Sequence, residues 1–234
     1  MKRLLCILAA GTMLLTLGAC KDTESDSNKT DSGNITAQLA KPEKGEDIAV
    51  ITTDFGEIKM KFFPKVAPKG VENFTTHVKN GYYNNLTFHR IVKDFVIQGG
   101  DPQGTGRGGE SIWGGKFNDE IDMTALHHFR GAVAYANSGK NSNGSQFYIV
   151  QPNTLSTGLD TQMKNAGWDQ AVIDAYKQYG GTPSLDGGYT IFGQVYEGMD
   201  VVDKIASVEI ADAQNGTPKD KVIIKKIEMK KYEG

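Results

Sequence analysis

Two stretches decide the fold of this chain: Phe88-His89-Arg90 running on to Gln98-Gly99-Gly100-Asp101, and Asn143-Gly144-Ser145-Gln146-Phe147-Tyr148. Both are typical of β segments that carry a polar group among apolar neighbours. Successive side chains of a strand point to opposite faces, so Gln146 and Tyr148 are predicted to share one face and Phe147 to occupy the other. The second stretch therefore predicts a strand that has one face toward a core and one toward a binding surface.

The same alternation applied to the first stretch places Phe88, Arg90 and Val92 together, and Val96 with Gln98. We therefore expect a surface with one guanidinium, two carboxamides and several apolar side chains. These residues contain no evident nucleophile, metal-ligand set or acid–base pair.

Four blocks of sequence occur in a familiar order and spacing. They are TFHRIVKDFVIQGGD, GGESIWGGKFNDE, GAVAYANSGKNSNGSQFYI and LDGGYTIFGQVYEGMDVV. Together they resemble the cyclophilin family of peptidyl-prolyl cis–trans isomerases, over roughly residues 48 to 230. A lone NGSQF would carry little weight, whereas four blocks in register are specific.

The pattern along the chain predicts many short strands and few helices, which is typical of a mainly β barrel or sandwich. The resemblance to cyclophilins selects a closed eight-stranded antiparallel β-barrel capped by helices. We expect a hairpin, a helix from Pro68 to Val78, four short β segments, a second helix and a closing strand, over residues 48–63, 68–78, 86–92, 95–99, 131–136, 145–151, 197–208 and 222–229.

Compared with compact cyclophilins, about two dozen residues around 154–182 are inserted. Within them, residues 168–176 have the spacing of an amphipathic helix. Two interpretations stay open for this insertion. It is either a packed surface elaboration, or a lid or side wall that alters substrate choice.

The resemblance also implies an active site. Arg90 takes the position of the catalytic arginine, and Gln98 matches the glutamine that positions this arginine and the substrate carbonyl. The other implied positions bind the peptide: an apolar pocket for the proline ring with Tyr189 on its rim, a segment whose backbone pairs with the substrate, and further groove residues. These are Phe95, Val96, Leu185, Tyr148, Tyr189, Ala136, Asn137, Ser138, Gln146 and Gly106.

Several of these positions depart from the commonest family pattern. Val96 stands in place of a methionine, and Tyr148 in place of a phenylalanine. Ser184 stands where many members have a tryptophan that contacts cyclosporin, and Tyr189 where many have a histidine. Since Arg90 and Gln98 are retained, we expect activity to survive and cyclosporin to bind weakly.

The N-terminus has the layout of a secretory signal peptide, with a cationic start, an apolar run from Leu4 to Leu17 and small residues before Cys20. This end resembles the lipobox of bacterial lipoproteins, in which Cys20 would be lipidated; a signal peptide with a chance cysteine is the alternative. We therefore divide the chain into a signal peptide (1–19), a lipidated, flexible tether (20–46) and an isomerase domain (47–234). The expected location is the extracytoplasmic face of a bacterial cell membrane.

Composition narrows the remaining function classes. The chain has 234 residues, 38% of them hydrophobic and 23% charged, with a formal net charge of −2, so nothing indicates a nucleic-acid partner. Without Cys6 and Cys20 the mature domain has no thiol, and His77, His127 and His128 lack metal-ligand spacing. His89 is expected on the face opposite Arg90, as a structural histidine. We expect no metal, no cofactor and a monomer.

Two functions from different classes fit these observations. The first is a membrane-anchored peptidyl-prolyl cis–trans isomerase that acts on proline-containing peptides and assists the folding of exported proteins. The second is a chaperone or adhesin module that binds proline-containing segments, with incidental turnover. Retention of Arg90 and Gln98 favours the enzyme, because a binding module has less need of them.

Overall fold

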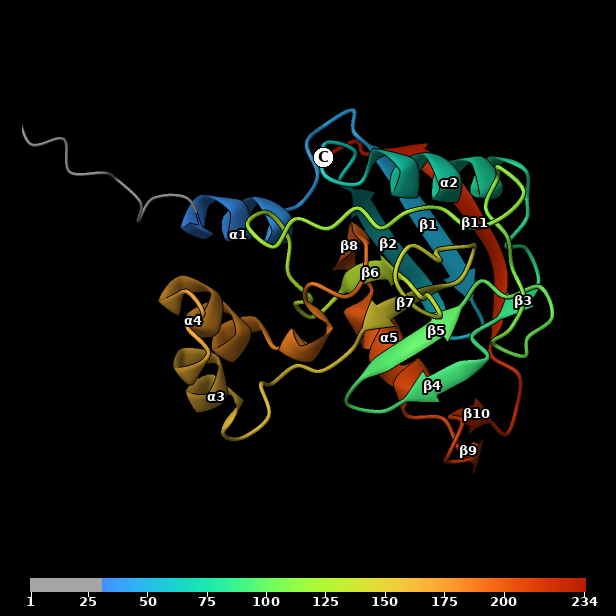
Figure 1. Cartoon of the computed structure of the whole chain (residues 1–234). Helices are drawn as coiled ribbons and strands as arrows, with labels where there is room; N and C mark the ends of the chain where they lie inside the picture. Colours follow the sequence, from blue (N-terminus) through green and yellow to red (C-terminus); the bar gives the residue numbers. More distant parts are fainter. Residues whose placement is uncertain (1–30) are drawn as a thin grey trace, which may run out of the picture.

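The computed structural model describes residues 31–234 as a curled β-sheet with helices around it (Figure 1). The strands are β1 (Asp47–Thr53), β2 (Gly56–Phe62), β3 (Leu86–Thr87), β4 (Arg90–Val92), β5 (Val96–Gly99), β6 (Ala132–Tyr135), β7 (Phe147–Val150), β8 (Ile191–Glu197), β9 (Ile210–Asp212), β10 (Thr217–Pro218) and β11 (Ile223–Lys231). The helices are α1 (Asp31–Leu39), α2 (Pro68–Lys79), α3 (Leu159–Asn165), α4 (Gln170–Tyr179), α5 (Met199–Ala206) and a short 3₁₀ turn, Pro183–Leu185.

The main sheet has nine strands in the order β3-β11-β1-β2-β8-β6-β7-β5-β4, and its neighbouring strands pair antiparallel. The expected mainly β, cyclophilin-like fold is confirmed. The expected closed barrel of eight strands is wrong, because this sheet has two free edges, at β3 and β4. A separate two-stranded sheet pairs β9 with β10.

The difference has a local cause. Residues 86–92 were expected to form one strand, but the chain leaves the ladder at Phe88-His89, so its two halves become the two edge strands. The Phe88 N–H donates to the Val222 carbonyl over 2.9 Å and so extends the pairing of β3 with β11, whereas the Ile91 N–H of β4 donates over 2.7 Å to the carbonyl of Gly216, which precedes β10. Joining β3 to β4 would give the predicted eight-stranded ring.

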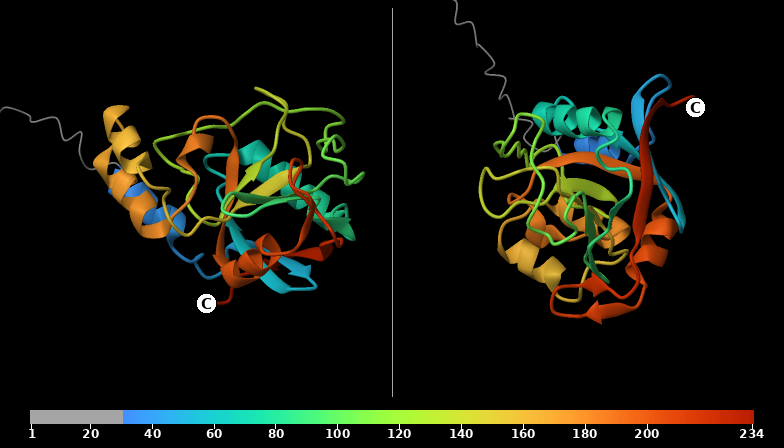
Figure 2. Two further views of the ribbon diagram at one scale, coloured as in Figure 1. Left: turned by 90° about the horizontal axis from the view of Figure 1, so that it is seen from below. Right: turned by 90° about the vertical axis from the view of Figure 1, so that its right-hand side faces the viewer.

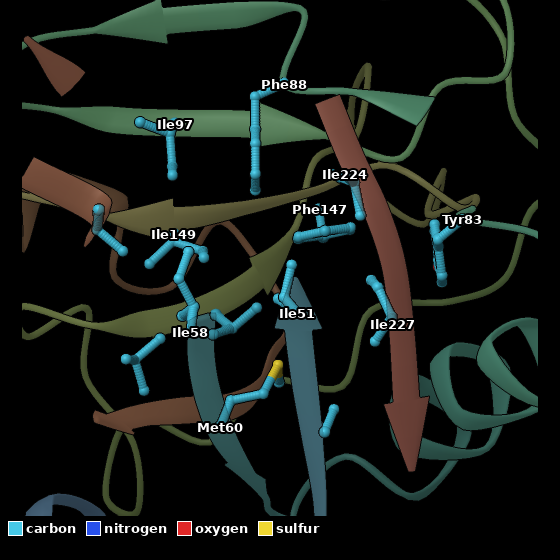
Figure 3. Packing of buried hydrophobic residues seen from close by; sticks show 14 of the residues in the cluster. Ile51, Ile58, Met60, Tyr83, Phe88, Ile97, Phe147, Ile149, Ile224 and Ile227 are labelled. Atoms are coloured by element: carbon cyan, nitrogen blue, oxygen red, sulfur yellow. The ribbon is translucent and has the colours of Figure 1, made fainter. Parts of the chain in front are cut away.

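The concave side of the sheet encloses the main hydrophobic core (Figure 3). Because alternate strand residues point inward, Ile91, Ile97, Phe147 and Ile149 meet there. Phe88 is also fully buried in this core. The prediction that Phe88 lies on the face of Arg90 is therefore wrong, because the break at Phe88-His89 interrupts the alternation.

Helices α2 and α5 pack against the sheet and add apolar side chains to the same core, among them Phe74 and Val202. Helix α2 begins with Pro68, whose fixed φ and missing N–H suit the first turn. The Glu120 carboxylate accepts hydrogen bonds from the free backbone N–H groups of Lys69 and Gly70. A loop far along the chain thus fixes the start of α2.

The insertion forms α3 and α4, which lie beside α1 at one side of the molecule (Figures 1 and 2). The predicted helix over 168–176 corresponds to α4, which spans residues 170–179. The rings of Tyr176 and Phe129 pack at a tilted angle with centroids 4.6 Å apart, in a second apolar cluster that includes Ile35 of α1.

Part of the segment that we interpreted as a flexible tether is ordered. Residues 31–39 form α1, in which Ile35 and Gln38 are buried. The Gln38 side-chain amide makes two hydrogen bonds to the His127 backbone: it donates to the carbonyl over 2.7 Å and accepts from the N–H over 3.0 Å. The polar composition suggested flexibility, but a few apolar residues and one amide suffice to dock the helix.

The signal peptide, Cys20 and residues 21–30 lie outside the described residues. In residues 31–234, no helix combines the length and the apolar character needed to cross a membrane. The division of the chain into leader, tether and isomerase domain stays a prediction.

Candidate active site

Three neighbouring strands place the predicted site residues in one row across the sheet. Arg90 of β4 lies opposite Gln98 of β5, and Gln98 lies opposite Tyr148 of β7. The intervening residues Ile91 and Ile97 point into the core, so this row faces away from it. Strand register therefore brings a guanidinium, a carboxamide and a phenol side by side on the outer face of the sheet.

The carboxamides form a fixed chain. Gln98 Nε2 donates to Gln146 Oε1 over 2.9 Å, and Gln146 Nε2 donates to the Gly108 carbonyl over 2.8 Å. The remaining carbonyl oxygen of Gln98 and the second hydrogen on each amide are available to a ligand. The two glutamines thus hold each other in place and still offer polar atoms to the groove.

Arg90 is held differently. Its guanidinium lies 5.9 Å from the ring centroid of Phe95. Among residues 31–234, no hydrogen bond or ion pair engages this guanidinium, and the residue is only partly buried. An arginine has five N–H donors in a planar fork, so Arg90 presents a positive, multiply donating group to whatever enters the groove.

Two cavities meet at Gln98 and Gly106. One has a volume of about 310 Å³ and is lined by Gln146 and by Ala136, Asn137 and Ser138. The other has a volume of about 710 Å³ and is lined by Arg90, among others. The two cavities share these lining residues and are lined mainly by polar residues on both sides of Gln98; together they are called the groove.

The loop that carries Gly106 is shaped by a buried carboxylate. Asp101 accepts hydrogen bonds from the backbone N–H groups of Gln103, Thr105 and Gly106, the last over 2.7 Å. Burial opposes ionisation of Asp101, but these hydrogen bonds outweigh it and lower the pKa of the carboxyl. Gly106 has φ +78°, a conformation that favours glycine and lets the loop turn along the groove.

The apolar residues implied by the family pattern gather next to this groove. Val96, Tyr148 and Leu185 are buried in one cluster, and half-buried side chains pack against it. Those side chains include Phe95, Ala136 and Tyr189. Each expected site residue from Phe95 to Tyr189 therefore lies in the polar groove or in this apolar cluster, whereas Cys20 lies outside the described residues.

His89 lies on the Arg90 side of the sheet, so the expectation that it faces the opposite way is wrong. It lines the same 710 Å³ cavity as Arg90, and its side chain is buried. Burial lowers its pKa, which favours the neutral ring. The cause is the same break between β3 and β4 that redirects Phe88.

A buried network that sequence reasoning missed lies behind the apolar cluster. Nδ1 of His127 and Nδ1 of His128 each contact the Asp186 carboxylate, at 2.8 and 2.7 Å. The Tyr176 hydroxyl donates to the same carboxylate over 2.8 Å. Burial of Asp186 favours its neutral form, but the hydrogen bonds from both histidines outweigh this effect and lower its pKa to about 2.

The network reaches the site itself. The Tyr148 hydroxyl and His128 Nε2 are 3.0 Å apart, and both side chains are buried. Nearly sixty residues separate His128 from Asp186, so their contact cannot be seen in the sequence. The sequence shows only two adjacent histidines and an acidic residue directly after Leu185. In residues 31–234, no set of three or more His, Cys, Asp or Glu side chains is spaced to hold a metal ion.

Comparisons with known proteins agree with this geometry. Residues 48–229 match the family model described as cyclophilin type peptidyl-prolyl cis-trans isomerase/CLD. A Staphylococcus aureus (strain USA300) protein named "Putative peptidyl-prolyl cis-trans isomerase" is 46% identical over 187 residues, covering 80% of this chain and 93% of its own. A Staphylococcus epidermidis protein of the same name is 47% identical over 174 residues, covering 74% and 88%.

Solved structures give the same result. A crystal structure of a Cryptosporidium parvum cyclophilin type peptidyl-prolyl cis-trans isomerase has a TM-score of 0.64 and 33% sequence identity, covering 80% of this chain and 98% of that one. A second structure of that protein, in the presence of the dipeptide Ala-Pro, also has a TM-score of 0.64. This chain therefore belongs to the cyclophilin family and is a cyclophilin-type peptidyl-prolyl cis–trans isomerase.

Proposed function

We propose that this enzyme accelerates rotation about X–Pro bonds without a covalent intermediate, with Arg90 stabilising the twisted amide. Resonance gives the C–N bond partial double-bond character and a barrier of about 18–20 kcal/mol. As the bond twists, the prolyl nitrogen regains a lone pair and becomes a hydrogen-bond acceptor. A group that donates to this nitrogen interacts with the transition state more strongly than with either planar form, and so accelerates the reaction.

The observation that carries this proposal is the state of the Arg90 guanidinium. It has no hydrogen-bond partner among residues 31–234, and it stands at the groove opposite Gln98. The adjacent cluster with Val96 and Tyr148 offers an apolar surface for a proline ring. The Ala-Pro dipeptide named with the Cryptosporidium structure supports a substrate of this chemistry for this chain as well.

The backbone at the groove suits an extended peptide. Ala136 donates its N–H to the Gln146 carbonyl over 2.9 Å, so this segment continues the ladder beyond β6. Asn137 and Ser138 follow along the edge of the smaller cavity. A substrate placed there pairs with the backbone of residues 136–138 while its proline ring reaches the apolar cluster.

A protease-coupled assay of an Ala-Pro peptide tests this function. Purified full chain is expected to accelerate cis-to-trans conversion in proportion to enzyme concentration, and the Arg90→Ala variant to lose most of the acceleration. If a folded wild type binds the peptide without accelerating conversion, the binding-module function replaces the enzyme.

We also propose that the enzyme acts on exported proteins at the extracytoplasmic face of the cell membrane, as a monomer anchored through lipid on Cys20. The support is the leader-like N-terminus and the small residues before Cys20. Two acyl chains on one cysteine give stable anchoring, whereas a single chain binds membranes only marginally. Cys20→Ser is expected to abolish labelling with radioactive palmitate and to move the protein out of the membrane fraction; unchanged membrane retention contradicts the anchor.

A further inference from the structure

The base of the apolar cluster contains a buried polar contact. Tyr148 is 4% exposed, and its hydroxyl lies 3.0 Å from His128 Nε2. The two rings are nearly parallel, with an interplanar angle of 21°. A phenylalanine at position 148 would leave His128 Nε2 without this partner, so the hydroxyl ties the orientation of the Tyr148 ring to His128.

Asp186 fixes His128 in turn. One carboxylate oxygen accepts from the His128 backbone N–H and from His128 Nδ1, each over 2.7 Å. A carboxylate only accepts hydrogen bonds, so Nδ1 carries the hydrogen, and in the neutral ring Nε2 accepts from the Tyr148 hydroxyl. The imidazole therefore has one orientation that satisfies both neighbours.

The other oxygen of Asp186 leads to the insertion. It accepts from the Tyr176 hydroxyl over 2.8 Å and contacts Nδ1 of His127 over 2.8 Å. Tyr176 belongs to α4 and is fully buried against Phe129. One carboxylate thus joins a helix of the insertion to the imidazole behind the apolar cluster.

The insertion is itself held in place on the side away from the groove. Met163 of α3, Val172 and Ile173 of α4, and Ile35 of α1 are buried together. Helix α4 therefore packs into the protein body, where it supports Asp186, and its buried face is not free to move over the groove as a lid.

We propose that Tyr176, acting through Asp186 and His128, positions Tyr148, so that the insertion determines the shape of the proline pocket and thereby the affinity for substrate. This inference rests on the proposed function, in which Tyr148 contacts the proline ring. It gives the insertion neither of the two roles considered from the sequence but a third one, that of a positioning element behind the pocket. Tyr176 is a positioning residue, because it acts through other side chains.

The expected changes in KM and kcat follow from the position of these residues behind the proline pocket. The proline ring is held in the pocket in the planar and the twisted forms alike, so a loosened pocket weakens ground state and transition state equally. Such a change raises KM and leaves kcat unaltered. Loss of a purely structural contact would instead lower the melting temperature and leave both kinetic parameters as they are.

The test compares Tyr176→Phe with Tyr179→Phe in the full chain. Tyr179 lies on the same helix but is 40% exposed, so it is a matched control. Tyr176→Phe is expected to raise KM for an Ala-Pro peptide about three- to ten-fold, with kcat within about two-fold of wild type, because each tenfold corresponds to only about 1.4 kcal/mol. Tyr179→Phe should match wild type.

A second comparison tests the chain of contacts itself. Tyr148→Phe removes the last contact of this chain of hydrogen bonds, so it should raise KM by a similar factor. The KM of the double variant Tyr148→Phe/Tyr176→Phe should be no higher than the larger of the two single-variant KM values. His128→Asn, which retains a donor near the Nδ1 position but loses Nε2, should behave like Tyr148→Phe and serves if Tyr176→Phe does not fold.

The outcomes separate this inference from the proposed function. If wild type accelerates conversion and Arg90→Ala does not, while Tyr176→Phe has the KM of Tyr179→Phe, the positioning role is overturned and the isomerase mechanism stands. Effects of Tyr148→Phe and Tyr176→Phe that multiply in the double variant also overturn it. A wild type without turnover overturns both.

Discussion

The two halves of the site are built in opposite ways. The polar half stands on β4 and β5, close to an edge of the sheet, and its central guanidinium has no hydrogen-bond partner among residues 31–234. The apolar half lies on β5, β7 and the Leu185 turn, and behind Tyr148 the side chains of His128 and Asp186 are hydrogen-bonded to each other, His128 also to the Tyr148 hydroxyl. This difference fits the proposed mechanism, in which free donors act on the twisting bond and a buried, hydrogen-bonded support holds the ring.

The largest effect is expected in the polar half. Arg90→Ala removes the donor that we propose meets the prolyl nitrogen, and loss of one such transition-state donor lowers kcat about 100- to 1,000-fold. Lys93→Ala, which removes a nearby exposed cation, is the control and should retain wild-type kcat. Stopped-flow or exchange measurements at saturating peptide give kcat directly. Equal loss in both variants would show that general positive charge, and not Arg90, matters.

The next largest effect is expected in the apolar half, on the free energy of unfolding. Asp186→Asn replaces a carboxylate that accepts from two histidines and Tyr176 with an amide that offers fewer acceptors. Loss of hydrogen bonds to a buried charge costs about 2–4 kcal/mol of the free energy of unfolding. Urea unfolding at pH 7 measures this cost, and Asp160→Asn, at an acidic residue in the first turn of α3, is the control.

The same carboxylate predicts a pH dependence. The pKa of Asp186 falls from an ordinary 3.8 to about 2 in the folded protein. A lowered pKa contributes stability above the unfolded pKa, and this contribution disappears as the pH falls from about 4 to about 2. At about 1.36 kcal/mol per pKa unit it amounts to about 2 kcal/mol. The loss of stability between pH 4 and pH 2 should therefore be smaller by this amount in Asp186→Asn; parallel pH curves would contradict the role of Asp186.

A smaller effect is expected for the support of the polar half. Gln98→Leu removes the donor that fixes Gln146, which keeps its own bond to Gly108. Since part of the arrangement survives, kcat/KM should fall about ten-fold, equivalent to one hydrogen bond of about 1.4 kcal/mol. Gln178→Leu on the exposed side of α4 is the control. A loss as large as that of Arg90→Ala would mean that Gln98, too, acts on the twisted bond.

The smallest effect is expected at the outermost support of the apolar half. Gln38→Ala removes the amide that brackets the His127 backbone and bonds Gln194. The free energy of unfolding should fall by about 1 kcal/mol, with kcat unchanged, because water can replace part of these bonds at the junction. Thermal unfolding of Gln38→Ala, compared with that of Lys41→Ala as a control, measures this loss of stability. A change in kcat would show that α1 acts on the polar half as well.

The two halves also differ in how well the sequence predicts them. Alternation along a short strand was enough to place Gln146 with Tyr148, because this is a local relation, whereas the association of Arg90 with Gln98 was implied by the resemblance to cyclophilins. The break at Phe88-His89 was not visible, since both residues suit a strand and only the pairing of their neighbours with different partners separates β3 from β4. Phe88 and His89 were therefore assigned to the wrong faces.

The support behind Tyr148 was beyond sequence reasoning for another reason. It joins α1, residues 127–128, the insertion and Asp186, which meet only after the sheet has curled. The polar residues before Asp47 suggested a flexible segment, whereas burial of Ile35 and the Gln38 amide makes residues 31–39 part of the folded body. Contacts of this kind depend on tertiary structure and have no periodic signature.

One measurement tests the division of labour between the halves most directly: kcat and KM of Arg90→Ala and Tyr148→Phe, determined side by side with wild type on the same Ala-Pro peptide. Arg90→Ala is expected to lose kcat with little change in KM, and Tyr148→Phe to raise KM and retain kcat. An Arg90→Ala variant that retains wild-type kcat would contradict stabilisation of the twisted amide by Arg90. Loss of the same parameter in both variants would contradict the separation of catalysis from ring binding.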